Sequence, residues 1–197
     1  MAKISNPAKA SISDETNICI GFTEYTSIAK GVEACDAMIK AAEIEVLFSK
    51  PVCAGKYITL ISGFVGAVKP SVQAALDIAK GSCIDHIIIP NIHPRVFPAL
   101  TGTTQITNWD AIGVVETFTM SSCLRASDLA VKSGEVELIE IRLGVGLGGK
   151  AYFTLTGEVS AVESAVKEGA EYAKELGTLV STVIIPRPTE EMRRFIL

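Results

Sequence analysis

Residues 20–45 read IGFTEYTSIAKGVEACDAMIKAAEIE, and residues 112–137 read IGVVETFTMSSCLRASDLAVKSGEVE. Eight of these 26 aligned positions are identical, whereas average composition gives about one or two identities by chance. In the first copy the identical positions are Ile20, Gly21, Glu24, Ala34, Asp36, Lys40, Glu43 and Glu45. The chain therefore contains an internal duplication with a displacement of 92 residues.

The duplication continues towards the end of the chain. With two residues inserted, Gly55-Lys56 aligns with Gly149-Lys150, and after a further insertion Ile88-Ile89-Pro90 aligns with Ile184-Ile185-Pro186. The 197 residues thus hold two units of about 90 residues each, a size that can fold alone. We expect an N-terminal extension at 1–16, a first domain at 17–105 and a second at 106–197.

Each unit shows the same order of predicted elements. β-rich apolar runs predict strands at 18–25, 45–49, 56–62 and 86–89, and at 111–118, 137–143, 150–156 and 179–185. Apolar residues at three- and four-residue spacing predict a helix after the first strand of each unit and another after the third. The order β-α-β-β-α-β is the ferredoxin-like pattern, so we predict an α+β fold with antiparallel sheets.

Composition excludes several classes of protein. The net charge is −4 and no basic cluster occurs, which argues against a nucleic-acid or anionic-membrane partner. No apolar run approaches the roughly 18 residues of a membrane span. The high apolar fraction of 48% favours an oligomer. Five cysteines without a CxxC pair, and no secretory signal in the first 17 residues, favour a cytoplasmic location.

A glycine-rich stretch, Gly144 to Lys150, matches the spacing of two phosphate-binding motifs. Those motifs require a helix next, because the helix N-terminus supplies the N–H groups that hold the phosphate. Here a predicted strand follows, and Ala151 stands where a magnesium-binding hydroxyl would be. We interpret the stretch as a tight loop between strands.

Conventional catalysis has little support. Glu24 and Glu116 occupy equivalent positions, which suggests either a pair of carboxylates or strand-end residues that form hydrogen bonds at an interface, and we favour the second. His93 lies in a turn, where we expect it to act as a cap. We predict that the protein is not an enzyme.

The cysteines differ by context. Cys35 lies on an apolar helical stripe and Cys123 near the start of the equivalent helix, so we expect both in the core. Cys53 instead lies in a predicted loop between Lys50 and Lys56. It is either an inert loop thiol or a reactive one that binds a soft metal. One cysteine cannot hold a cluster, but three copies on a symmetry axis could.

Several segments resemble bacterial microcompartment shell proteins. They are 26–31, 36–40, 53–56, 62–68, 91–94, 113–117, 146–150 and 185–188. The duplication makes the chain similar to the tandem-domain, trimeric members of this family, and most of all to those of propanediol-utilisation compartments. The resemblance covers about residues 17–197.

The resemblance implies a pseudohexameric trimer that tiles beside hexameric shell proteins around encapsulated enzymes. It implies a central pore lined by Pro51, Val52, Cys53, Ala54, Gly55, Gly146, Leu147 and Gly148. It places Lys40, Lys132, Asn91 and Arg187 at the shell edges. In the propanediol relatives, the matching loop cysteine of three chains ligates one [4Fe–4S] cluster, so Cys53 is the implied metal ligand.

A structural shell subunit is therefore the leading hypothesis, with a central pore or cluster that passes metabolites or electrons. The alternatives are a soluble cysteine-based redox or iron–sulfur carrier and a small-molecule-binding regulator. Only the shell protein should assemble into extended sheets.

Overall fold

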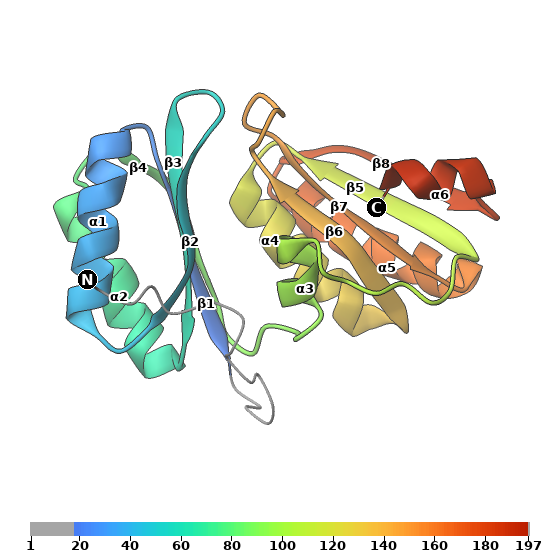
Figure 1. Ribbon diagram of the computed structural model, residues 1–197, viewed down its shortest axis with the longest axis horizontal. Coiled ribbons are helices and arrows are strands. Elements are labelled where there is room, and N and C mark those ends of the chain that lie inside the picture. Colours follow the sequence, from blue (N-terminus) through green and yellow to red (C-terminus); the bar gives the residue numbers. More distant parts are fainter. Residues whose placement is uncertain (1–17, 197) are drawn as a thin grey trace, which may run out of the picture.

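The first repeat folds into one sheet with two helices on one face. The computed structural model describes residues 18–196. The elements of this repeat are β1 (Cys19–Tyr25), α1 (Ile28–Ala41), β2 (Glu45–Val52), β3 (Lys56–Gly63), α2 (Val65–Ile78) and β4 (Cys83–Ile89). The strands pair antiparallel in the order β2-β3-β1-β4, and α1 and α2 lie on the same side of the sheet (Figure 1).

The second repeat has the same arrangement. Its elements are β5 (Ala111–Thr117), α4 (Met120–Ser133), β6 (Val136–Leu143), β7 (Ala151–Gly157), α5 (Val159–Glu175) and β8 (Leu179–Pro186). The antiparallel order β6-β7-β5-β8 reproduces that of the first sheet. The predicted duplicated α+β fold is confirmed.

The shared Ile-Gly at the start of each repeat has a packing role. A Cβ atom on Gly21 would lie 2.7 Å from Cγ2 of Val72, and one on Gly113 would lie 2.5 Å from Cγ2 of Val166. Both separations are shorter than carbon atoms tolerate. The absent side chain therefore lets α2 and α5 approach the central strand of their sheets closely.

The two repeats share apolar packing. The helix-free face of the first sheet turns towards α4 of the second repeat (Figure 1). One core cluster contains Phe22 and Leu60 from the first sheet together with Met120 and Leu124 from α4, and all four are fully buried. Burial of side chains of this size contributes about 1.5–3 kcal/mol each, so the domains are joined by a true hydrophobic core.

Two short helices lie outside the predicted pattern. α3 (Val96–Thr101) follows β4, and α6 (Glu190–Ile196) follows β8. Helices of six and seven residues complete at most two turns, too few for an apolar period to be visible in the sequence. They occupy corresponding places in the two repeats, and α3 packs on β6 of the second repeat.

The predicted N-terminal extension at 1–16 lies outside the described residues. Within residues 18–196, no helix has both the length and the apolar content needed to cross a membrane.

Candidate functional site

Loops from both repeats meet at one end of the molecule. The β2–β3 and β6–β7 connections lie beside each other (Figure 1). The backbone N–H of Cys53 donates to the carbonyl of Gly144 at 3.2 Å. The backbone N–H of Gly146 donates to Sγ of Cys53 at 3.4 Å. The two segments that the resemblance assigned to a pore are thus neighbours within one chain.

The predicted pore residues differ in exposure. Pro51, Cys53, Ala54, Gly55, Gly146 and Gly148 are exposed, Leu147 is half-buried, and Val52 is buried. A Cβ atom on Gly144 would lie 3.3 Å from Cβ of Val52, which shows that Val52 packs beneath the glycine loop. The exposed surface of these loops therefore combines small residues, one thiol and the apolar side chain of Val145, which is 52% exposed.

The glycine-rich stretch is a tight connection, as predicted. Gly144, Gly146, Gly148 and Gly149 all have positive φ, between 61° and 92°. Side chains are disfavoured in this region, so glycine is required for the chain to reverse here. β7 follows directly, and no helix N-terminus is available to a phosphate at this loop.

The duplicated glutamates bind the duplicated lysines. Oε1 of Glu24 lies 2.6 Å from Nζ of Lys56, and the Glu24 side chain is only 4% exposed. Glu116 forms the equivalent ion pair with Lys150. The two carboxylates lie in different sheets, and each holds the lysine at the base of its own loop. Each glutamate therefore bonds a lysine of its own sheet, and its location at an interface stays a prediction.

Among the cysteines, Cys53 is exposed, Cys19 and Cys123 are buried, and Cys35 and Cys83 are half-buried. Burial raises the pKa of the Cys123 thiol well above its usual range. Within residues 18–196, no group of three His, Cys, Asp or Glu side chains is arranged to hold a metal ion. A cluster on Cys53 would therefore need donors from further copies of the chain.

The expectation that Cys35 is a core residue is wrong for the isolated chain. α1 has two apolar faces, and the face against its own sheet is formed by Gly31, Ala34 and Met38. Cys35 lies on the other face, whose members Ile28, Val32 and Ile39 are 46%, 53% and 54% exposed. The corresponding residues of α4 are Met120, Leu124 and Val131, which are 0%, 0% and 4% exposed.

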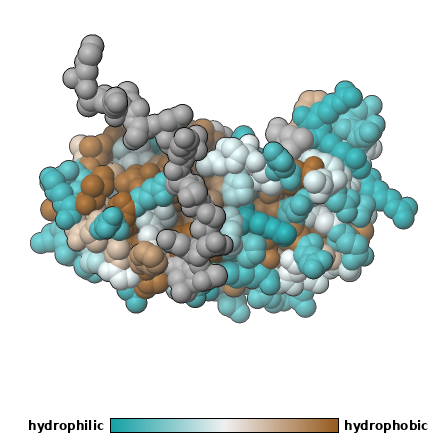
Figure 2. Space-filling model, turned by 60° about the horizontal axis from the view of Figure 1, so that its bottom comes forward, coloured by the Kyte–Doolittle hydropathy of each residue, from teal (hydrophilic) through white to brown (hydrophobic). Residues whose placement is uncertain are grey.

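This difference follows from what covers each helix. The outer face of α4 packs on the first sheet within the same chain, whereas no described residue covers the outer face of α1 to the same extent. In Figure 2, hydrophobic side chains accordingly form patches on the left-hand side, over the first repeat.

Two of the four predicted edge residues meet at the boundary between the repeats. Nζ of Lys132 donates to the carbonyl of Asn91 at 2.7 Å, and the backbone N–H of His93 donates to Oδ1 of Asp128 at 2.9 Å. Nδ1 of His93 accepts a hydrogen bond from the backbone N–H of Arg95 at 3.2 Å, so this histidine caps a turn. Lys40 and the Arg187 side chain are exposed and lie apart from this contact.

Asp128 is the residue at this boundary that sequence reasoning missed. Its carboxylate is fully buried and receives Arg125 at 3.0 Å and Lys132 at 2.8 Å. The signal was available, because Asp36 and Lys40 repeat as Asp128 and Lys132 with the same spacing. What sequence could not show is that one copy of this pair is buried and the other exposed.

Comparison with known proteins agrees with this architecture. The BMC domain family model matches residues 19–92 and 111–188. Bacterial microcompartment shell protein PduT of Citrobacter freundii is 42% identical over 175 residues, covering 89% of this chain and 95% of PduT. Shell protein EutM of Salmonella typhimurium is 37% identical over 79 residues, covering 40% of this chain and 80% of EutM.

A solved structure gives the same result. The crystal structure of a microcompartment protein from Desulfitobacterium hafniense DCB matches with a TM-score of 0.86 and 48% identity, covering 90% of this chain and 98% of that one. Two BMC domains in one chain account for the duplicated sequence and the two matching sheets. The chain belongs to the BMC-domain family, as a tandem-domain structural protein of a bacterial microcompartment shell and not an enzyme.

Proposed function

We propose that three copies of this chain close into a flat, pseudohexameric disc with the loops of residues 51–55 and 144–149 around its centre. The supporting observation is the unequal burial of two equivalent helices. The outer face of α4 is covered by the first sheet, while that of α1 is about half exposed at the same positions. The second sheet of another copy is the surface equivalent to the one that covers α4.

This contact is head-to-tail, because it joins the second domain of one chain to the first domain of the next. Heterologous contacts close into a ring when the rotation between neighbours permits it. If the contact between chains repeats the contact within a chain, each domain turns by the same angle, and an angle of one sixth of a turn closes the ring with six domains, or three chains. The half-exposed apolar stripe on α1 would then be buried at three places.

Within this disc, residues 17–105 and 106–197 are the two shell domains, and the exposed loop residues around Cys53 line the central pore. Lys40, Lys132, Asn91 and Arg187 lie at the rim, where neighbouring domains meet and where other discs, including hexameric shell proteins, approach. The disc separates the enclosed enzymes from the cytoplasm and admits small molecules at its centre.

Sedimentation and electron microscopy of the purified full chain test this proposal. We expect a trimer at micromolar concentration and extended two-dimensional sheets at higher concentration. A monomer without sheets would contradict the shell disc and would favour a soluble redox carrier that uses Cys53 directly.

The centre of the disc would also suit an iron–sulfur cluster. The residues fit this group: Cys53 is exposed at a loop tip, its Sγ already accepts a backbone hydrogen bond, and each chain offers one such thiol. Cys53 from three chains would ligate three irons of one [4Fe–4S] cluster and leave the fourth to a non-protein ligand. When bound, the cluster would supply one-electron redox chemistry at the shell wall.

Anaerobic reconstitution tests the cluster. We expect about four irons per trimer and a visible charge-transfer absorbance in the wild-type protein. Cys53→Ser should abolish both, because a serine oxygen is too hard a ligand for iron–sulfur chemistry. Cys35→Ser is the matched control, since Ser127 already occupies the equivalent position of α4. Iron-free wild-type protein after reconstitution would leave the disc as a metabolite pore only.

A further inference from the structure

The two repeats of one chain contact each other through a turn after β4 and the helix α4. The equivalent turn and the equivalent helix also occur in the chain, but they do not contact each other. After β4 the chain turns at Asn91, which has a left-handed backbone with φ 52°. The carbonyl of Asn91 accepts from Lys132, and the N–H two residues later donates to Asp128. A turn at the end of the first sheet is thus held by an aspartate and a lysine on α4.

The same turn recurs at the end of the second sheet. Arg187 follows β8 as Asn91 follows β4, and it has a similar left-handed backbone with φ 49°. The next residue is buried in both turns, Ile92 in the first and Pro188 in the second. The main chain of residues 187–189 therefore presents a carbonyl and an N–H in the order that α4 recognises at residues 91–93.

The matching aspartate and lysine lie on α1. Asp36 and Lys40 correspond to Asp128 and Lys132, but their side chains are 61% and 73% exposed instead of 0% and 36%. Within the described part of the chain, these two side chains pair only with each other. One half of the contact is present on α1, and the other half is present after β8.

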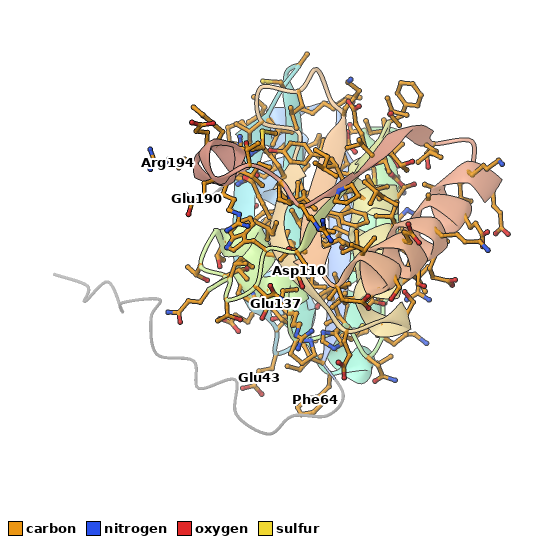
Figure 3. All side chains as sticks on the ribbon, turned by 90° about the vertical axis from the view of Figure 1, so that its right-hand side faces the viewer. Glu43, Phe64, Asp110, Glu137, Glu190 and Arg194 are labelled. Atoms are coloured by element: carbon orange, nitrogen blue, oxygen red, sulfur yellow. The ribbon has the colours of Figure 1, made fainter. Side chains whose placement is uncertain are left out.

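The short helices after the two turns show the same relation. Val96 and Ala99 of α3 are 0% and 1% exposed, and α3 packs on β6 of the second repeat. Their counterparts in α6, Met192 and Phe195, are 40% and 83% exposed. Figure 3 shows α6 at the surface, with Glu190 and Arg194 pointing away from the sheet. α6 therefore carries an uncovered apolar face beside the turn.

We propose that the turn 187–189 of one copy is clasped by α1 of the next. Nζ of Lys40 donates to the carbonyl of Arg187, and the backbone N–H of Thr189 donates to the carboxylate of Asp36. Met192 and Phe195 of α6 pack beside β2 of the same neighbour, as α3 packs beside β6. The partner is a second copy of this chain, and the proposal rests on the trimer proposed above.

This contact explains why the second domain keeps a left-handed residue at position 187. A backbone with positive φ costs a non-glycine residue free energy, and it is retained where the surrounding contacts require it. Within the chain the equivalent strain at Asn91 presents a carbonyl to Lys132. In the proposed contact, the same backbone conformation at position 187 presents its carbonyl to the neighbouring copy.

Cysteine cross-linking tests the contact directly. Lys40→Cys and Arg187→Cys are combined in a full-length chain with Cys35, Cys53 and Cys83 replaced by serine, and a short bis-maleimide is added. We expect covalent dimers and trimers on a denaturing gel. Lys132→Cys with Asn91→Cys in the same background is the matched control; it should cross-link within one chain and stay at the position of the monomer on the gel.

Sedimentation of Lys40→Ala provides the second measurement. Loss of a charged hydrogen bond at each contact should raise the dissociation constant of the trimer at least about tenfold. Lys132→Ala should lower the melting temperature of the chain, because its partners are in the same chain.

The outcomes separate this inference from the proposed function. A wild-type trimer with neither intermolecular cross-links nor weaker assembly in Lys40→Ala would overturn the clasp and leave the trimer standing. Wild-type protein that sediments as a monomer would overturn the trimer itself.

Discussion

The hydrogen bonds and the pKa of His93 are set by its position at the boundary between the two domains. Its backbone N–H binds Asp128, and its ring accepts from the backbone of Arg95. Burial lowers the pKa of His93 below its ordinary value of 6.5; the positive charges of Arg95 and Lys132 act in the same direction, and Asp128 opposes them. The folded chain therefore binds a proton at this ring less readily than the unfolded chain does.

A pH dependence of stability follows from this pKa. Above the ordinary histidine pKa both states are neutral and the stability is full; as the pH falls through the window below 6.5, the unfolded state takes up the proton first and stability decreases. We expect urea midpoints to fall between about pH 7 and pH 5. His93→Asn, which keeps an acceptor for the turn, should flatten that slope. An unchanged slope in the variant would assign the dependence to other groups.

At the scale of the element, each domain depends on a close contact between a helix and the central strand of its sheet. α2 crosses β1 where Gly21 has no side chain, and a Cβ atom there would meet Val72 and Val68 at 2.7 and 2.9 Å. Gly66, within α2 itself, has no atom within 4 Å of the Cβ position. The two glycines therefore differ in what an added methyl group would do.

We predict that Gly21→Ala destabilises the fold by about 1–3 kcal/mol, because the added methyl group overpacks the contact between α2 and β1. Gly66→Ala should be neutral or stabilising by up to about 1 kcal/mol, because alanine restricts the unfolded chain and favours the helix. Chemical denaturation monitored by circular dichroism measures both. Equal midpoints for Gly21→Ala and wild type would show that the helix can move away at little cost.

At the scale of the whole molecule, α1 and α4 are equivalent helices of the two repeats that lie in different environments. Val32 is 53% exposed in the chain, whereas its equivalent Leu124 is fully buried between the repeats. An acidic side chain at these two positions should therefore have different consequences.

Val32→Glu should leave the circular dichroism spectrum unchanged and convert the trimer to monomer, because the charge would be buried only on assembly. Leu124→Glu should destabilise the chain itself by about 3 kcal/mol or more, since it places an unpaired charge in the core. Light scattering and thermal melts distinguish the two. A stable trimer of Val32→Glu would mean that the outer face of α1 stays in solvent.

The sequence by itself determined the duplication, the βαββαβ order and the structural character of the glycine loop. These features are local or periodic: Gly144 to Gly149 can be recognised as a β–β connection because a strand follows. The Glu24–Lys56 and Glu116–Lys150 ion pairs could also have been predicted from the sequence, because both the glutamate and the lysine repeat at equivalent positions.

The tertiary structure alone decided which copy of each repeated residue is buried. Asp128 and Asp36 have the same spacing to a lysine, yet the first is fully buried and the second exposed. Cys35 and Met120 lie on equivalent apolar stripes, and only the stripe on α4 meets a sheet of its own chain. A helix face is buried only where a surface from a distant part of the chain packs on it. Residue type and spacing within the helix do not show which surface that is.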